Sequence, residues 1–402
     1  MSPAILNASD NAAVARKSGW IPRVAIVCDF LEEQWASMDL VGTMLEEGLR
    51  GFAEHFQVTR LCPPMRRRFT TGHTDAVKVL FNADRMLNRF WDYPRWLEAK
   101  VDEFDVFHIV DHSYSQLVHQ LPPHRTVVTC HDIDAFRSVL TTLEQKRSPL
   151  FRAMTRHTLR GFQKAARITC DSVATRNDIL AHGLVDPERL IVVTNGVHPT
   201  CSPKPDAESD GEADRLLGPS GPNDLLHVGT TIPRKRIDVL IQILARVRER
   251  IPDVRLIRVG GPFTAEQKAL ISRLNLQNAI LELAHLERNV LAAVYRRASV
   301  LLLPSEREGF GLPLAEAMAC GTVVVASDLP VLREVGGEAA EYCAVADTER
   351  WAQKIASLLS ERRKHPDSWK RKCDRGIRQA SRFTWAEYAK SMARIYSELL
   401  GT

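Results

Sequence analysis

The chain has 402 residues, a formal net charge of +5 and a pI of about 8.8, with 45% apolar and 26% charged residues. This composition excludes a disordered or fibrous protein. The basic excess falls short of that of a nucleic-acid-binding protein, so we expect no nucleic-acid partner. Because one hydrophobic core serves roughly 100 to 200 residues, the length predicts two domains.

The spacing of the cysteines and the length of the apolar runs indicate where in the cell the protein is located. The eight cysteines form no Cys-x-x-Cys pair and no His-Cys cluster with metal spacing, so we expect no structural zinc. Several lie in apolar runs, where a reduced thiol packs as a small apolar group. No apolar run reaches about 18 residues, and the first 20 residues lack the apolar stretch of a signal peptide. We therefore predict a cytoplasmic protein that does not span a membrane.

Apolar runs alternate with amphipathic segments along the first half of the chain. The runs are RVAIVCDF (23–30), FDVFHIVD (104–111), TVVTCHD (126–132), RITCDS (167–172) and RLIVVTNG (189–196). Each is apolar at both odd and even positions, which is typical of parallel strands covered on two faces. The pattern predicts an extension over residues 1–22 and a first α/β domain over residues 23–200.

A segment rich in Pro, Gly, Ser and Asp, residues 201–224, then predicts a linker. The alternation resumes in LLHVG (225–229), RLIRVGG (255–261), AILELA (279–284), VLLLPS (300–305), TVVVASD (322–328) and EYCAV (341–345). Capping boxes are predicted where Thr264 precedes Gln267 and Thr384 precedes Glu387. We expect a second domain over residues 225–383, and three successive helices from residue 347 to the end. Both domains should be doubly wound and Rossmann-like, with a ligand cleft beyond their strand ends.

The first turn of the second domain is basic. Gly229 ends a strand, and the cations Arg234, Lys235 and Arg236 stand just before a helix. Helix-start amides and adjacent cations would hold a diphosphate, although such a triplet also fits a solvated surface turn. Gly260 follows the next strand, where a missing Cβ allows either a close approach to a ligand or a simple turn.

The stretch EREGFGLPLAEAMACG (306–321) follows another strand and combines a glycine turn with two carboxylates, Glu308 and Glu316. It is not a dinucleotide fingerprint, because position 314 is Leu. Carboxylates repel phosphates but accept strong hydrogen bonds from neutral hydroxyls. Each glutamate alone also fits an ordinary helical side chain. Together, on either side of a diphosphate site, they indicate a nucleotide sugar, with a hexose at one end and a ribose at the other.

Polar residues also end two strands of the first domain. His131 and Asp132 follow one strand, and Asp111 and His112 follow another. Such side chains bind hydroxyls or carry protons, but each histidine could equally be satisfied by nearby backbone. Asp132 and Asp134 spell the D-x-D of metal-dependent transferases. Because the first of them ends a strand, we expect no metal ion.

Several motifs resemble one family. They are HVGTTIPRKRIDVL, RLIRVGGP and VYRRASVLLLPSEREGFGLPLAEAMACGTVVVASDLPVLREVGG in the second domain, with TCHD, ITCDSVATRNDIL and VVTNGVH in the first. They are similar to those of the retaining, nucleotide-sugar-dependent glycosyltransferases of family 4, which have the GT-B fold. The resemblance runs from about residue 23 to the end, and the interval from Glu308 to Glu316 matches the family's E-x7-E motif.

The resemblance implies roles for individual residues. Glu308 would hold the hydroxyls of the donor sugar and Glu316 those of the ribose. Lys235 corresponds to the family's phosphate-binding lysine, and His131 to a histidine near the transferred sugar. The family often has arginine at position 230, which is Thr here, so Arg234 would substitute for it. The remaining donor contacts would come from the backbone of Gly229, Gly260, Gly309, Phe310, Gly311 and Leu312. No metal ion or other cofactor is implied, and the helix over residues 384–402 should return to the first domain.

The function expected from this resemblance is transfer of a hexose from a nucleoside-diphosphate sugar to a glycan, glycolipid or other hydroxyl acceptor, with retention of configuration, in cell-surface polysaccharide or glycolipid synthesis. A sugar-nucleotide epimerase or a phosphorylase would share the two domains. A non-enzymatic adaptor for membranes or nucleic acid would use MRRRF (65–69) and NRFWDYPRW (88–96), where arginines interleave with aromatic residues. In a transferase, the same segments would either dock the first domain on the inner face of an anionic membrane that bears a lipid-linked acceptor, or form the wall of the acceptor site.

Overall fold

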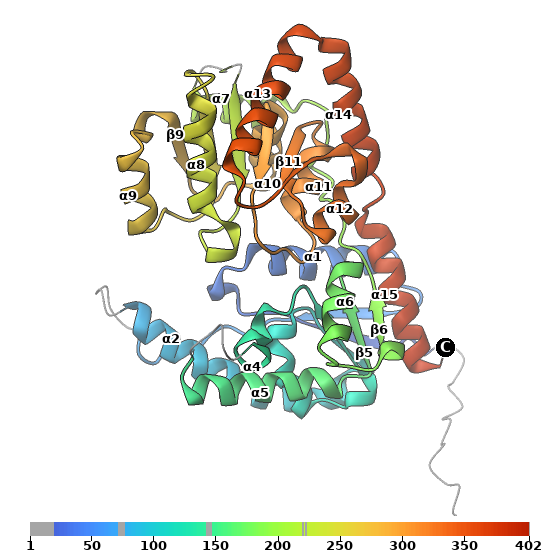
Figure 1. Ribbon diagram of the computed structural model, residues 1–402. Helices are drawn as coiled ribbons and strands as arrows, with labels where there is room; N and C mark the ends of the chain where they lie inside the picture. Colours follow the sequence, from blue (N-terminus) through green and yellow to red (C-terminus); the bar gives the residue numbers. More distant parts are fainter. Residues whose placement is uncertain (1–19, 71–76, 142–146, 219–220, 222, 402) are drawn as a thin grey trace, which may run out of the picture.

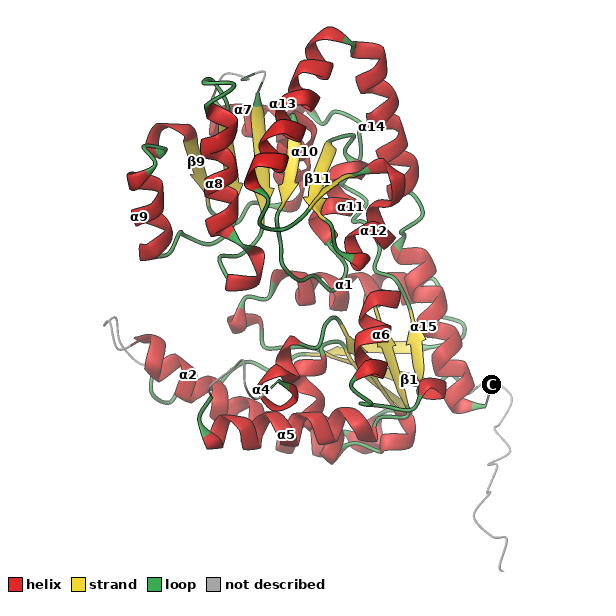
Figure 2. Cartoon of the chain, in the orientation of Figure 1, coloured by secondary structure: helices red, strands yellow, loops and turns green. Residues whose placement is uncertain are grey.

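The computed structural model describes residues 20–70, 77–141, 147–218, 221 and 223–401. It contains two domains, each built on a six-stranded sheet whose described strand pairs are all parallel. The first sheet has the order β2-β1-β3-β4-β5-β6, and the second has the order β12-β11-β10-β7-β8-β9. Helices cover the sheets in both domains (Figure 2). The predicted fold class, two doubly wound α/β domains, is confirmed.

The first domain begins at the end of the predicted extension, most of which lies outside the described residues. Its strands are β1 (Arg23–Val27), β2 (Gln57–Leu61), β3 (Val106–Ile109), β4 (Thr126–Cys130), β5 (Arg167–Cys170) and β6 (Leu190–Val192). Its main helices are α1 (Ala36–Arg50), α2 (Val77–Leu87), α3 (Tyr93–Glu98), α4 (Arg137–Leu140), α5 (Pro149–Lys164) and α6 (Val173–Ala181). A π-helical turn, η2 (Asn88–Asp92), joins α2 to α3, and a 3-10 segment, η4 (His112–Gln120), follows β3.

Strand β2 was missed by the sequence analysis. It pairs with β1 in register, from Arg23 opposite Gln57 to Val27 opposite Leu61. It lies at the edge of the sheet, and its residues alternate between more and less exposed positions. An edge strand that is half exposed carries polar residues, so it lacks the continuous apolar run by which the other strands were recognised.

The second domain has the strands β7 (Asp224–Val228), β8 (Arg255–Val259), β9 (Ile280–Leu283), β10 (Val300–Leu303), β11 (Val323–Ser327) and β12 (Glu341–Cys343). Its helices are α8 (Ile237–Arg248), α9 (Ala265–Arg273), α10 (Arg288–Arg297), α11 (Leu312–Ala319), α12 (Pro330–Gly336), α13 (Thr348–Lys364) and α14 (Pro366–Ala380). A short 3-10 turn, η8 (Pro233–Lys235), precedes α8. The capping box of Thr264 and Gln267 is present at the start of α9, as predicted.

The segment predicted as a linker contains a helix, α7 (Ala207–Leu217). The side chain of Asp206 caps it by accepting a hydrogen bond from the Ser209 amide at 2.8 Å. Ala213 and Leu217, four residues apart on one face, are buried in the core of the second domain. Most of its residues are small or charged, which is why composition alone indicated a linker. An N-cap and two buried apolar positions were enough to form and attach the helix.

The last helix, α15 (Trp385–Leu400), returns to the first domain (Figure 1). The hydroxyl of Thr384 accepts a hydrogen bond from the Glu387 amide and so caps its start. Tyr388, Met392 and Tyr396 are buried in a core shared with β1 and α1 of the first domain. The predicted return of the C-terminal helix is confirmed. No helix within the described ranges is long and apolar enough to cross a bilayer.

Parallel strands place their carboxyl ends at one edge of each sheet, and this edge carries the polar loops. In the first domain, Asp29 follows β1, Asp111 follows β3 and His131 follows β4. In the second domain, Gly229 follows β7, and the loop that contains Glu308 follows β10. Strands β7 and β10 are neighbours in the sheet, so their loops are brought together although they lie more than 70 residues apart in the chain.

Candidate active site

Glu308 is the centre of a buried charge cluster. Lys235 donates to both of its carboxylate oxygens, at 2.7 and 3.0 Å, and Arg234 donates to one at 3.4 Å. The hydroxyl of Ser305 donates to the other oxygen at 2.6 Å. Only 5% of the Glu308 side chain is exposed. The structure therefore brings together three residues that the sequence predicted for the donor site.

The cluster keeps Glu308 ionised. Burial raises the pKa of this carboxyl group, but the charges of Lys235 and Arg234 outweigh burial, and the net pKa is lowered. Sequence reasoning treated Glu308 as a carboxylate free to bind sugar hydroxyls. In the structure it is also the counter-ion of the two cations expected to bind phosphate. Its proximity to Lys235, 73 positions away in the chain, could not be read from the motif alone.

The glycine turn after Glu308 packs directly against the first domain. A Cβ atom at Gly309 would overlap the carbonyl oxygen of His131. The carbonyl of Gly309 accepts hydrogen bonds from the hydroxyls of Ser172, at 2.9 Å, and Thr175, at 3.3 Å. Only glycine allows this approach, so the turn fixes the contact between the two domains at the predicted site.

The rest of the turn begins α11. Gly311, with φ of 92°, precedes the helix in a left-handed conformation that favours glycine, and Leu312 is the first helical residue. The ring of Phe310 is buried and packs edge-on against Phe383, with ring centroids 5.4 Å apart. The Phe310 side chain therefore belongs to the core, and only its backbone is available to a ligand.

Glu316, on α11, lies in a different environment from Glu308. The hydroxyl of Tyr295 donates to one of its oxygens at 2.9 Å. Burial raises the pKa of Glu316, and this hydrogen bond and the charge of Arg288 only partly offset the effect. The two glutamates of the motif thus have opposite pKa shifts, although both are buried.

Two further glycine loops are held together by a residue that sequence reasoning missed. Arg258, buried in β8, donates to the carbonyl of Gly229 at 2.8 Å and to that of Gly261 at 2.6 Å. A Cβ atom at Gly260 would overlap the Gly229 carbonyl oxygen. Burial lowers the pKa of Arg258. A charged residue inside the apolar run RLIRVGG was the signal that could have found it.

His131 has both ring nitrogens engaged. Nδ1 lies 2.6 Å from an oxygen of Asp171, and Nε2 lies 2.8 Å from the carbonyl oxygen of Val110. Both partners are acceptors, so the ring donates from both nitrogens as an imidazolium. Burial lowers the pKa of His131, but the Asp171 carboxylate and the other acceptors raise it to about 9 overall. At neutral pH this ring has no free nitrogen with which to take up a proton.

Four polar side chains near His131, those of Asp29, Asp111, His112 and Asp132, lie in a second cluster at the same sheet edge. Asp29 is 2% exposed, and neither of its carboxyl oxygens has a hydrogen-bond partner among the described residues. Burial and the neighbouring Asp111 raise its pKa. His112 lies 3.2 Å from Asp111 and 3.8 Å from Asp132, also without a hydrogen bond from either nitrogen. Such atoms are typical of a surface that binds water or ligand hydroxyls. Sequence reasoning missed Asp29, although it closely follows an apolar strand as Asp132 does.

The D-x-D residues, Asp132 and Asp134, pair with arginines. Arg234 of the second domain lies 3.5 Å from Asp132 and 3.4 Å from Asp134, and Arg307 lies 3.3 Å from Asp134. Arg137, on the first domain, lies 2.7 Å from the same carboxylate. Across the described ranges, no three His, Cys, Asp or Glu side chains form a group that could hold a metal ion.

Two family models match this chain. One, described as Glycosyltransferase Family 4, matches residues 41–200, and the other, described as Glycosyl transferases group 1, matches residues 210–375. These ranges hold most of the first and second domains. Both domains therefore match glycosyltransferase families. The chain belongs to glycosyltransferase family 4, as its motifs indicated.

Curated relatives are similar over part of their length. A D-inositol 3-phosphate glycosyltransferase of Thermobispora bispora is 31% identical over 250 residues, which are 59% of this chain and 56% of that protein. An MMP alpha-(1->4)-mannosyltransferase of Mycolicibacterium hassiacum is 31% identical over 234 residues, 57% of this chain and 53% of that protein. The matches thus span slightly more than half the length of these relatives.

Solved structures share the fold over nearly the whole chain. A sucrose-phosphate synthase from Thermosynechococcus elongatus has a TM-score of 0.73 and 20% identity, and the match covers 94% of this chain and 99% of that one. Anabaena HepE, solved in complex with UDP and glucose, has a TM-score of 0.70 and 17% identity over 94% of this chain and 100% of that one. These likenesses confirm the GT-B arrangement.

The charge on His131 predicts a pH dependence of stability. A histidine has a pKa near 6.5 when unfolded, and here the folded value is about 9. The stabilisation is therefore complete below about pH 6.5 and is lost as the pH rises toward about 9, by up to about 3 kcal/mol. Urea titrations across this range should show the free energy of unfolding falling. In Asp171→Asn, whose histidine lacks the counter-charge, the decline should be smaller; equal declines in the two proteins would contradict the assignment.

Proposed function

We propose that this protein transfers a hexose from a nucleoside-diphosphate sugar to a hydroxyl group of a glycan, glycolipid or cyclitol acceptor, with retention of configuration. The observation that carries the proposal is the convergence of Lys235, Arg234 and Glu308 at the domain interface. Two adjacent cations suit a diphosphate, and an ionised carboxylate between them suits sugar hydroxyls. Membership of the family supports the same reaction.

The mechanism that fits these residues uses the leaving group. Retaining hydrolases need a nucleophilic carboxylate about 5 Å from an acid. Glu308 is instead held by cations, and His131 has no free nitrogen. In the proposed reaction, Lys235 and Arg234 stabilise the negative charge that grows on the leaving diphosphate. The acceptor hydroxyl attacks on the same face and passes its proton to a diphosphate oxygen, as positioning by the two domains allows.

A nucleotide-sugar panel tests the donor class. HepE was solved with UDP and glucose, so UDP-glucose is the first donor to try, beside GDP and ADP sugars. We expect one of them to raise the melting temperature, because a ligand that binds only the folded state stabilises it. The best donor should then be hydrolysed slowly and transferred when an acceptor is present. Stabilisation by none of the panel would count against the proposal, and interconversion of the sugar without an acceptor would indicate an epimerase.

Lys235 should be needed for turnover. Lys235→Ala removes one of the two cations that would stabilise the leaving diphosphate, so we expect kcat to fall by more than about tenfold. The matched control is Arg236→Asn. Arg236 belongs to the same triplet but pairs with Asp238, at 3.0 Å, and with Glu306, at 3.7 Å, and asparagine tolerates its left-handed conformation. The control should keep turnover within about twofold of the parent. Near-normal turnover of Lys235→Ala would refute the phosphate assignment.

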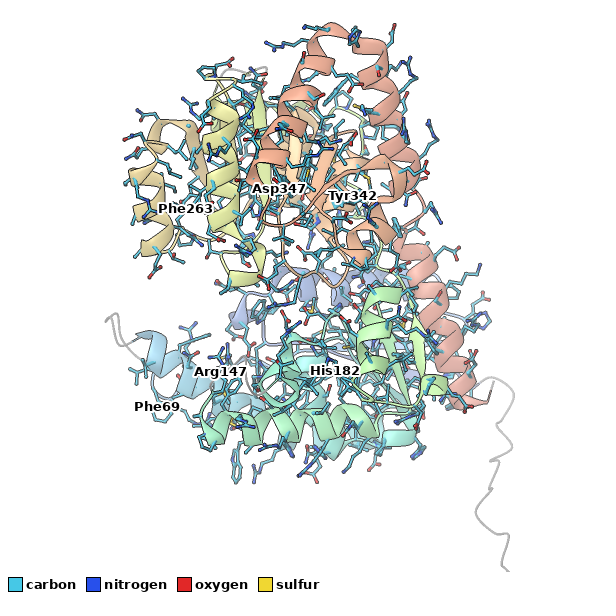
Figure 3. The ribbon with its side chains drawn as sticks, viewed as in Figure 1. Phe69, Arg147, His182, Phe263, Tyr342 and Asp347 are labelled. Carbon is cyan, nitrogen blue, oxygen red and sulfur yellow. The ribbon has the colours of Figure 1, made fainter. Side chains whose placement is uncertain are left out.

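We also propose peripheral contact between the first domain and an anionic membrane. Helix α5 carries four cations and no acidic residue, and its first turn exposes Leu150 and Phe151. Phe69 of the MRRRF segment and Trp91 of the NRFWDYPRW segment are also exposed. Phe69 and Arg147 lie on the α2 side of the domain (Figure 3). Exposed rings beside basic residues are typical of surfaces that bind lipid headgroups. In the MRRRF segment, Arg66 and Arg68 also pair with Asp92, at 3.6 and 2.7 Å.

Vesicle sedimentation tests this contact. The protein should sediment with vesicles that contain phosphatidylglycerol and not with phosphatidylcholine alone, and added salt should weaken the binding. The double variant Arg156→Glu, Arg160→Glu reverses two exposed charges of α5 and should abolish binding. Its control is Lys390→Glu, Arg394→Glu, which changes two exposed cations of α15. Equal loss in both variants would show only a general charge effect and would contradict the α5 surface.

A further inference from the structure

Arg234 is shared between the two domains. Its guanidinium lies 3.4 Å from Glu308 in its own domain, and 3.5 and 3.4 Å from Asp132 and Asp134 in the other. It also donates to the carbonyl of Arg307 at 3.1 Å. Burial lowers the pKa of Arg234, but these three carboxylates more than restore it. One cation expected to bind the donor's diphosphate is therefore surrounded by protein carboxylates.

We propose that Asp132 and Asp134 are positioning residues that compete with the donor's diphosphate for Arg234. When the donor binds, phosphate oxygens replace these two carboxylates, and the ion pairs between Arg234 and the first domain are released, while Arg307 keeps its ion pair with Asp134 at 3.3 Å. This inference rests on the proposed function, because it needs a diphosphate ligand. It goes beyond the proposed function because Asp132 and Asp134 have no assigned contact with the donor.

The exchange is favoured by the exposure of the partners. The side chains of Asp132, Asp134 and Arg234 are 25%, 28% and 21% exposed, and the two interdomain distances exceed 3.3 Å. Ion pairs of this kind contribute little and are easily broken. A diphosphate offers more negative charge and several acceptor oxygens, so its charge-assisted bonds to a guanidinium are stronger. Glu308 stays in place, since Lys235 holds it at 2.7 Å.

Arg234 would not lose its orientation when the two aspartates are released. Its hydrogen bonds to Glu308 and to the Arg307 carbonyl come from its own domain and do not depend on the interface. Asp134 also has Arg137 as a partner at 2.7 Å within the first domain. Each side of the contact thus retains a partner after separation, as an exchangeable contact requires. A purely structural bridge would leave its charges unpaired when broken.

The test is donor affinity in Asp134→Asn. Removing this negative charge takes away both a competitor for Arg234 and a repulsion of phosphate. The dissociation constant of the best donor from the panel, measured by calorimetry, should fall by about three- to tenfold. KM for the donor should fall similarly, whereas kcat should not rise. The control is Glu334→Gln, which weakens another interdomain contact, the hydrogen bonds from the amides of Val173 and Ala174. It should leave donor affinity unchanged.

A double variant separates competition from a structural effect. In an Arg234→Ala background, the gain in donor affinity from Asp134→Asn should shrink, because only the reduced repulsion of phosphate remains once the shared partner is gone. If Asp134→Asn binds the donor as the parent does, or more weakly, the exchange is refuted while the transferase proposal stands. A gain of undiminished size without Arg234 would also refute it. If the parent binds no nucleotide sugar, both proposals fail.

Discussion

The pairing of a buried carboxylate with two cations, Glu308 with Lys235 and Arg234, is the interaction on which the site depends. Taking these charges out of water is costly, and only close mutual pairing offsets the cost. The pairing joins the loop after β7 to the loop after β10, which are neighbouring strands. It therefore sets the position of the glycine turn that follows Glu308. Loss of Glu308 would leave Lys235 without its carboxylate partner and weaken the contact between the two loops.

The glycine turn, whose position is set by this pairing, contacts the first domain directly. Gly309 meets the His131 carbonyl so closely that no side chain is tolerated, and Ser172 and Thr175 bind its carbonyl oxygen. His131 is in turn fixed by Asp171. The interface is thus built from backbone contacts and fixed hydrogen bonds at its centre, with partly exposed ion pairs of Arg234 at its edge. The centre defines the geometry, and the edge is where charges can exchange partners.

The sequence predicted the sheets well, because strands covered on both faces are continuous apolar runs. It missed β2, whose edge position permits polar residues, and α7, whose attachment needs only Ala213 and Leu217 on one face. The sequence indicated which residues belong to the site, but not which of them contact one another. Contacts such as Arg258 to Gly229, or Lys235 to Glu308, join residues about 30 and 73 positions apart. Local patterns hold no information on such pairs until the strand order is known.

The two glutamates of the motif illustrate the difference between composition and environment. Both are buried, and burial raises the pKa of each. Glu308 has two cations beside it, so its net pKa falls. Glu316 has a tyrosine hydroxyl and the charge of Arg288, which do not outweigh burial, so its pKa stays raised. A fully ionised carboxylate between cations suits the region of the donor where charge develops. A buried carboxyl group whose pKa is raised suits a neutral diol, which would add the hydrogen bonds that favour its ionised form. Two residues of the same type in one motif therefore lie in different electrostatic environments.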